Sequence, residues 1–247
     1  MKSFDIEPIC IYSDPENKML CEKFGFESYE FPNEPLGAKF NFGIEKALTT
    51  KWDYLMQTNS DDLIKEELLE LYQPYLWRKE QCFGVGEVYY YDLKSGRVAY
   101  VDNPFPLGCA RMIHRDVITS HNKVEVKFTA SVAGQITFGK GAKTELTEKQ
   151  AQSYGETVKI IGKVENFKLY TDNKNRVLDF DSDSRLAKIG VNSVKVPCDK
   201  KILVVDMKSD VNIWFFEWFE DSIIEVDILK HFPERNEIRK LRQVYSH

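Results

Sequence analysis

Two adjacent carboxylates, Asp61 and Asp62, stand where a strand-like segment gives way to a helix-like one. Residues 52–56 are mostly apolar and of strand length, and residues 63–72 repeat apolar side chains at helical spacing. The pair is therefore expected at the carboxyl end of a strand, the edge at which open α/β sheets bind ligands. Because adjacent carboxylates repel each other, the arrangement favours a bound cation. Helix capping is the alternative interpretation, and it does not exclude the first.

A second acidic cluster lies in residues 176–184, Arg-Val-Leu-Asp-Phe-Asp-Ser-Asp-Ser. If the first pair holds a divalent ion on a diphosphate leaving group, then Asp179, Asp181 or Asp183 suits the role of general base on an incoming hydroxyl. The alternative is a solvated turn whose acids cap a short helix over residues 185–189.

The elements expected before the acidic pair alternate between strand and helix. They are a strand over 7–12, a helix over 17–24, a strand over 28–31 and a helix over 37–48. Lys39 and Asn41 fall near the start of the last helix, where backbone N–H groups favour anions. A solvated surface lysine is the alternative interpretation of Lys39.

The elements expected after the acidic pair are mostly strands. They are a long strand over 82–91, a hairpin turn at 92–96 with a return strand over 97–101, an ordered stretch over 110–117, and strands over 194–196 and 201–206. Between them, residues 121–168 change character and predict a small β-α-β module. Its parts are a strand over 123–128, a helix over 144–154 with a capping box at Thr147 and Gln150, and a strand over 158–164.

Composition narrows the class of protein. The chain has 247 residues, 43% of them hydrophobic and 30% charged, as is usual for globular proteins. A net charge of −5 provides no basic field for nucleic acid. No stretch is apolar enough for a membrane span, and the acidic N-terminus is not a signal peptide. Five scattered cysteines without ligand spacing predict reduced thiols, a cytoplasmic location and no zinc site.

The order of these motifs resembles the nucleotide-sugar half of glycosyltransferases with the A-type fold, close to family 2. The resemblance rests on Asn-x-Pro-Leu-Gly-x-Lys-x-Asn at 33–41, Trp-Asp-Tyr-Leu-Met at 52–56 and Asn-Ser-Asp-Asp-Leu at 59–63. It covers about residues 6–118 and resumes around 170–233. It implies an α/β fold with a Rossmann-like mixed sheet flanked by helices, in three parts: 1–120, the inserted module 121–168, and 169–247. The family's usual first strand-helix unit is missing, because the chain begins at what resembles the second strand.

The resemblance also implies roles for particular residues. Asp61 and Asp62 match the family's aspartates for Mn²⁺ or Mg²⁺, and His231 matches a histidine that helps to bind the metal in some members. Asp179 and Asp181 match the later acidic motif that supplies the base. Residues expected to contact the donor are Lys39, Asn41, Asn59 and Ser60. The implied function is metal-dependent transfer of a sugar from a nucleotide-diphosphate sugar to an unknown hydroxyl acceptor.

The inserted module has a resemblance of its own. Val126–Gly134 and Leu146–Ala151 resemble a small module common in proteins of tailed bacteriophages. This implies a phage-encoded protein of the host cell cytoplasm or the virion, and a protein partner bound through residues 121–168. The alternative function is therefore a non-catalytic virion or assembly protein built on a degenerate glycosyltransferase fold.

Overall fold

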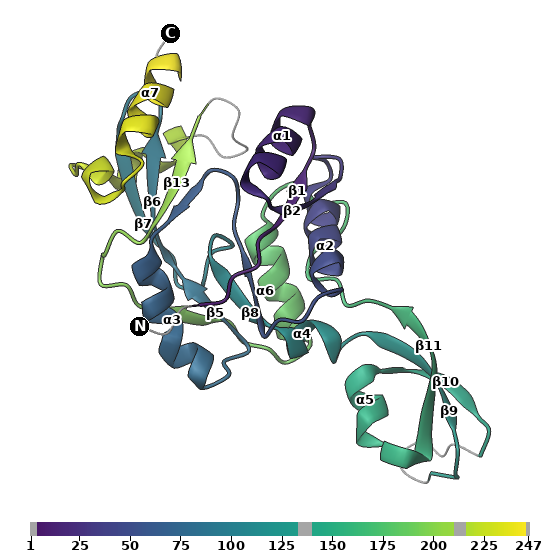
Figure 1. Cartoon of the computed structure of the whole chain (residues 1–247). Coiled ribbons are helices and arrows are strands. Elements are labelled where there is room, and N and C mark those ends of the chain that lie inside the picture. Colours follow the sequence, from purple (N-terminus) through teal and green to yellow (C-terminus); the bar gives the residue numbers. More distant parts are fainter. Residues whose placement is uncertain (1–3, 133–139, 210–215, 246–247) are drawn as a thin grey trace. The chain divides into compact units, whose positions relative to one another are not determined.

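The computed structural model describes residues 4–132, 140–209 and 216–245, and its helices and mixed sheets form an α/β protein (Figure 1). The chain divides into two compact units, Met1–Asp53 with Arg115–Val191, and Tyr54–His114 with Asn192–His247. The predicted module 121–168 falls inside the first unit. No helix among the described residues is long and apolar enough to cross a membrane.

The first unit begins with two parallel strands and two helices. They are β1 (Ile9–Tyr12), α1 (Pro15–Phe24), β2 (Glu27–Glu30) and α2 (Leu36–Ala47). Asp14 caps α1 by accepting a hydrogen bond from the backbone N–H of Asn17 at 2.9 Å, and Pro15 occupies the first turn. Gly25 ends the helix with a left-handed φ of +69°. These elements confirm the prediction of alternating strands and helices.

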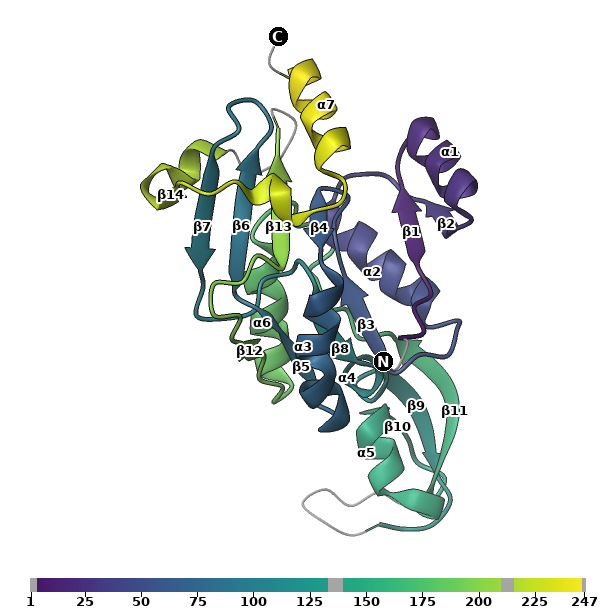
Figure 2. The ribbon, with the colours of Figure 1, turned by 60° about the vertical axis from the view of Figure 1, so that its left-hand side comes forward.

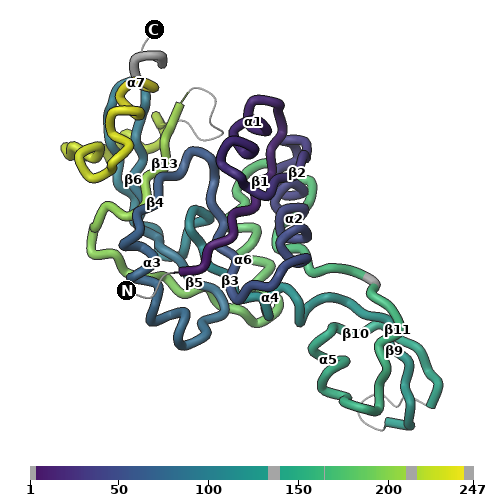
Figure 3. The backbone as a smooth tube through the Cα atoms, viewed as in Figure 1, coloured from purple at the N-terminus to yellow at the C-terminus, as the bar shows by residue number. Residues whose placement is uncertain are grey.

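The module is a three-stranded antiparallel sheet with one helix (Figure 3). After α4 (Arg115–Thr119) come β9 (Lys123–Phe128), β10 (Lys143–Thr147), α5 (Glu148–Ser153), a 3-10 turn (Gly155–Thr157) and β11 (Val158–Glu165). The predicted capping box of Thr147 and Gln150 is confirmed. The prediction of a helix from residue 144 is wrong, because 143–147 pairs with β9 as a strand. Part of the phage-like motif, residues 133–134, lies outside the described residues.

The second unit contains two sheets, and Figure 2 shows the strands of the larger one next to one another, from one edge of the sheet to the other. The first sheet has the order β12-β5-β8-β3, from β12 (Val194–Val196), β5 (Cys82–Val85), β8 (Arg111–His114) and β3 (Tyr54–Gln57). The second has the order β14-β7-β6-β13-β4, from β14 (Ile223–Ile224), β7 (Val98–Asp102), β6 (Glu87–Asp92), β13 (Val204–Lys208) and β4 (Asp62–Ile64). Its helices are α3 (Glu66–Trp77), the 3-10 helices η2 (Phe216–Ser222) and η3 (Ile228–His231), and α7 (Arg235–Tyr245).

The strand predicted over 82–91 is two strands in two sheets, and Gly86 separates them. A Cβ on Gly86 would stand 2.5 Å from the carbonyl oxygen of Asn103, so only glycine fits this close approach. The chain therefore leaves one sheet at Val85 and enters the other at Glu87, and buried apolar residues on both sides of Gly86 belong to one core cluster.

Candidate metal centre

The acidic pair lies in a turn between two strands rather than between a strand and a helix. β3 ends at Gln57, β4 begins at Asp62, and α3 starts only at Glu66. The residue that precedes α3 is Lys65, whose side chain makes no capping hydrogen bond. The interpretation of Asp61 and Asp62 as caps of this helix is therefore wrong, because a short strand separates them from it.

Strand β13 brings a third carboxylate to the pair. β4 and β13 run antiparallel, with Asp206 directly opposite Asp62, and the backbone N–H of Met207 donates to the carbonyl oxygen of Asp61 at 2.8 Å. One oxygen from each of Asp61, Asp62 and Asp206 lies within 4.8 Å of the others. We call these three residues the carboxylate triad. Like charges placed opposite each other on neighbouring strands destabilise a sheet, so the triad needs a compensating cation or proton.

The two carboxylate oxygens of Asp62 have different surroundings. Its Oδ2 accepts hydrogen bonds from the backbone N–H of Asn59 at 2.7 Å and from the hydroxyl of Thr58 at 3.4 Å. Its Oδ1 is buried and has no hydrogen-bond partner in the part of the chain that the structure describes. Burial, reinforced by the charge of Asp61, raises the pKa of Asp62 to about 6.

Asp206 is paired with a buried lysine two residues further along β13. The Nζ of Lys208 donates a hydrogen bond to Oδ2 of Asp206 at 2.7 Å. It also lies 2.7 Å from Oδ1 as an ion pair, without forming a hydrogen bond to that oxygen. Lys208 is only 5% exposed, and its ammonium lies 5.4 Å from the ring centre of Tyr90. Burial raises the pKa of Asp206 to about 7 in spite of this lysine.

The donor set fits a hard divalent cation. The triad brings three carboxylates together, and the ammonium of Lys208 pairs with one of them, Asp206. Oxygen donors are the ligands that Mg²⁺, Mn²⁺ and Ca²⁺ prefer. The buried Oδ1 of Asp62 supplies a lone pair that the protein itself does not use. The residues suited to hold such an ion are therefore Asp61, Asp62 and Asp206.

The other residues predicted at this site have different surroundings. Asn59 and Ser60 are exposed in the turn beside the triad, in position to meet a ligand. His231 ends η3 and does not belong to the triad, so its role as a metal ligand stays a prediction. Asp206 was missed by sequence reasoning. The available signal was a carboxylate inside the apolar run Ile202–Met207, where a charge needs a partner.

The second acidic cluster lies in the first unit, and the carboxylate of Asp181 in it is bonded to several neighbours. Its residues 178–184 belong to α6 (Leu178–Lys188), so the predicted turn is wrong. Asp181 Oδ2 accepts from the backbone N–H of Thr171 at 2.7 Å, and its Oδ1 accepts from the Thr171 hydroxyl at 3.0 Å and pairs with Lys174 at 3.2 Å. Burial opposes ionisation, but these bonds outweigh it and lower the pKa of Asp181. Asp179 lies in the first turn of the same helix, and its carbonyl oxygen accepts a hydrogen bond from the hydroxyl of Ser182.

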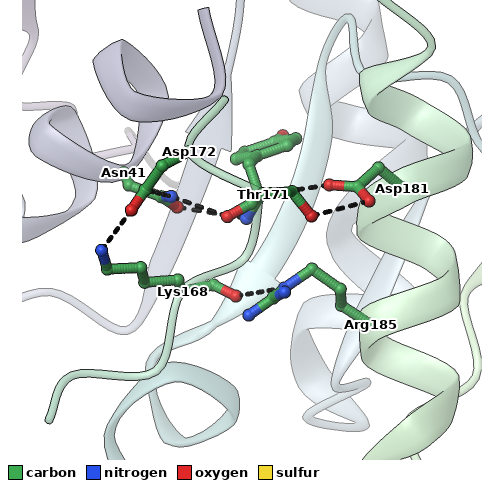
Figure 4. A network of polar contacts seen from close by, with 7 residues as sticks. Asn41, Lys168, Thr171, Asp172, Asp181 and Arg185 are labelled. Atoms are coloured by element: carbon green, nitrogen blue, oxygen red, sulfur yellow. Dashed lines mark hydrogen bonds and ion pairs between the residues drawn. The ribbon is translucent and has the colours of Figure 1, made fainter. Parts of the chain in front are cut away.

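Asn41 and Asp172 extend this cluster into what we call the clamp network: Asn41, Lys168, Thr171, Asp172, Lys174 and Asp181. Figure 4 shows Thr171 facing Asp181 and Asp172 facing Asn41. The Nδ2 of Asn41 donates to the carbonyl oxygen of Tyr170 and to Asp172, and its Oδ1 accepts from the N–H of Tyr170. The side chain predicted to contact a donor is thus buried and bonded within the protein.

The start of α2 is closed by the same loop. The first three N–H groups of the helix, at Leu36, Gly37 and Ala38, donate to Asn175 Oδ1 and to the carbonyl oxygens of Lys174 and Asp172. A Cβ on Gly37 would stand 2.1 Å from the carbonyl oxygen of Thr171, so the contact requires glycine. The expectation that these N–H groups serve an anion is wrong, because the chain itself occupies them.

Lys39 lies one turn into α2 and points to the loop after β1. Its Nζ donates to Ser13 Oγ at 2.8 Å and to Asn33 Oδ1 at 3.1 Å. Partial burial lowers the pKa of Lys39. The solvated-surface interpretation is therefore wrong, since the ammonium is fixed by two neighbours.

Comparisons with protein-family models, curated proteins and solved structures found no match. The chemistry of the site must therefore be argued from the residues themselves. Among the described residues, the carboxylate triad is the only group of three or more acidic, histidine or cysteine side chains arranged closely enough to hold a metal ion.

Proposed function

We propose that this protein binds a divalent cation, Mn²⁺ or Mg²⁺, at Asp61, Asp62 and Asp206, and that it is a glycosyltransferase which uses this ion to bind a nucleotide-diphosphate sugar. The observation that carries the proposal is the buried Oδ1 of Asp62, which has no hydrogen-bond partner among the described residues and lies in a triad with two further carboxylates. A buried acceptor of this kind costs stability unless a proton or cation meets it.

The position of the triad supports the choice of ligand. The turn that carries Asn59 and Ser60 is exposed, so a diphosphate has access to the ion from solvent. A bound divalent cation supplies neutralisation of the charge that develops on a diphosphate leaving group. Asp61 and Asp62 come shortly after strand β3, which ends at Gln57, and the resemblance to the A-type glycosyltransferase fold implies such a position. The base role of Asp179 or Asp181 and the donor contact of Lys39 remain predictions within this proposal.

Calorimetric titration tests the proposal. Mn²⁺ is titrated into the protein first, and UDP and GDP are then titrated with and without Mn²⁺. We expect metal binding to the wild type, nucleotide binding that requires the metal, and loss of both in Asp62→Asn. Asp102→Asn is the matched control, because Asp102 is an exposed acid of the same unit, paired with Lys195. Nucleotide binding that is independent of both Mn²⁺ and Asp62 would contradict the proposal.

A second candidate function is the docking of a protein partner through residues 121–168. The module has a core of its own, made by Val124, Val126, Phe128 and Ala151. Its edge strand β11 carries two adjacent exposed isoleucines, Ile160 and Ile161, 47% and 40% exposed, at a β-bulge. Exposed apolar residues on an unpaired edge favour association.

The module offers a clean excision test of this second function. Its first and last strands end side by side, with Lys123 opposite Glu165, so a short Gly-Ser link can replace it (Figure 3). We expect the excised protein to keep Mn²⁺ binding and to lose assembly with its partner in co-purification. Unchanged assembly would exclude the module as the docking element.

A further inference from the structure

Lys208 occupies an unusual place at the carboxylate triad. It is a lysine with 5% exposure on a central strand, a position that a lysine seldom takes without a charge partner. Its Nζ lies 2.7 Å from each oxygen of Asp206 and so covers the whole carboxylate. In the cation-free protein, one of the three triad members is thus already held by an internal cation.

Two cations compete for Asp206. A divalent ion that takes a ligand from each triad member must approach Asp206 within the short distances that oxygen ligands require. At that separation the ion and the ammonium repel each other in a poorly hydrated site. Both can stay only if the ammonium withdraws from at least one Asp206 oxygen.

We propose that Lys208 is a built-in counter-ion of the metal centre: its ammonium holds Asp206 in the cation-free protein and is displaced from it when a divalent cation binds. This inference rests on the proposed function. Lys208 acts through Asp206 and is a positioning residue. The withdrawn ammonium stays beside the site because β13 fixes its backbone between β4 and β6, and it then adds positive charge where the proposed diphosphate binds. Lys208 therefore lowers metal affinity in the absence of nucleotide and couples metal binding to nucleotide binding.

The test compares Mn²⁺ affinities in the absence of nucleotide. Lys208→Met keeps the apolar stem and removes the charge, and Lys208→Gln is a second variant with a polar end. The control is Lys195→Met, which breaks the exposed ion pair with Asp102 in the same unit. Mn²⁺ is titrated by calorimetry into each protein, and the shift of the thermal midpoint is measured with and without Mn²⁺.

We expect both Lys208 variants to bind Mn²⁺ about tenfold or more tightly than the wild type and to gain more thermal stability from it, with Lys195→Met unchanged. Equal or weaker binding by the Lys208 variants would overturn the inference. So would failure of both variants to fold with Mn²⁺ present, because a replaceable counter-ion is not required for folding.

The same data separate this inference from the proposed function. If the wild type binds Mn²⁺ in an Asp62-dependent manner but the Lys208 variants bind it no more tightly, only the counter-ion role fails. If neither the wild type nor the Lys208 variants bind Mn²⁺, the metal centre itself fails, and the counter-ion role falls with it.

Discussion

The carboxylate triad and the clamp network place similar residues in opposite electrostatic states. In the clamp network, Asp181 accepts a backbone N–H, a hydroxyl and an ammonium, and its pKa is lowered. In the triad, Asp62 and Asp206 have their pKa values raised to about 6 and about 7, and Asp62 Oδ1 has no partner. Acidic residues whose bonds are complete stabilise the fold, whereas acidic residues left with excess charge are candidates for binding a cation.

The comparison separates two motifs that look alike in the sequence. Asp-Asp at 61–62 and Asp-x-Asp-x-Asp at 179–183 are both acidic runs beside apolar segments. Only the neighbours that the fold supplies distinguish them, a strand with a third carboxylate in one case and a loop of hydrogen-bond donors in the other. Three substitutions and one pH series test whether the two clusters differ in this way.

The largest expected effect is on stability, from Asp181→Ala. The change leaves the N–H of Thr171 and the ammonium of Lys174 without their acceptor, and we expect the free energy of unfolding to fall by about 3 kcal/mol. Denaturant unfolding measures it. Ser184→Ala on the exposed side of α6 is the control and is expected to change stability by less than about 0.5 kcal/mol. Equal effects of the two changes on the free energy of unfolding would contradict the stabilising role of Asp181.

Asp62→Asn is expected to weaken Mn²⁺ binding roughly 10- to 100-fold, since an amide cannot supply the charge that the ion needs. The matched change in the other cluster, Asp181→Asn, is expected to leave Mn²⁺ affinity within about twofold of the wild type. Calorimetry with Mn²⁺ alone measures both. If both variants lost affinity equally, the electrostatic contrast between the clusters would not predict where the metal binds.

Asn41→Ala tests whether the clamp network is structural throughout. The Asn41 side chain bonds to the Tyr170 backbone at both ends of its amide, so its removal is expected to cost about 2 kcal/mol of stability. Mn²⁺ affinity is expected to stay unchanged, and thermal unfolding and calorimetry check the two statements. A loss of Mn²⁺ affinity without a loss of stability would instead assign Asn41 to the binding site.

A pH dependence of opposite sign is expected for the two clusters. Between about pH 4 and pH 7 the folded protein keeps protons on Asp62 and Asp206 that the unfolded chain has lost, because their pKa values lie above the ordinary 3.8. The free energy of unfolding without metal is therefore expected to fall as the pH rises through this window. The pKa of Asp181 is lowered by the fold, so its carboxylate stabilises the folded protein at pH values above the ordinary aspartate pKa of 3.8. That contribution is lost as the pH falls through the pKa of Asp181 in the folded protein.

Denaturant unfolding at a series of pH values measures both trends. Mn²⁺ at pH 7.5 is expected to restore the stability that the triad loses, and Asp62→Asn is expected to flatten the profile between pH 4 and pH 7. A wild-type profile that is flat over this window would mean that the triad carboxylates ionise with ordinary pKa values, and a rising profile would mean that the fold lowers those values.

Local sequence signals predict several of the elements and part of the site. Asp14, Pro15 and Gly25 bound a helix by conformational preferences that need no distant partner, and Thr147 with Gln150 does the same for α5. The strand before Asp61 was also predictable from its apolar run, and so was the favourable place for a cation beside two adjacent acids. Such signals are short-range, and each is complete within a few residues.

The surroundings of those elements depend on long-range contacts that local patterns do not predict. Asp206 joins the triad because β13 pairs with β4 in one register, across more than 140 residues of chain, and no local pattern encodes that register. The loop 172–175 occupies the start of α2 for the same long-range reason, which turned a predicted anion site into an internal contact. Burial and charge balance depend on such pairings, so the sequence indicated where chemistry was possible, and the fold separated the satisfied acids from the unsatisfied ones.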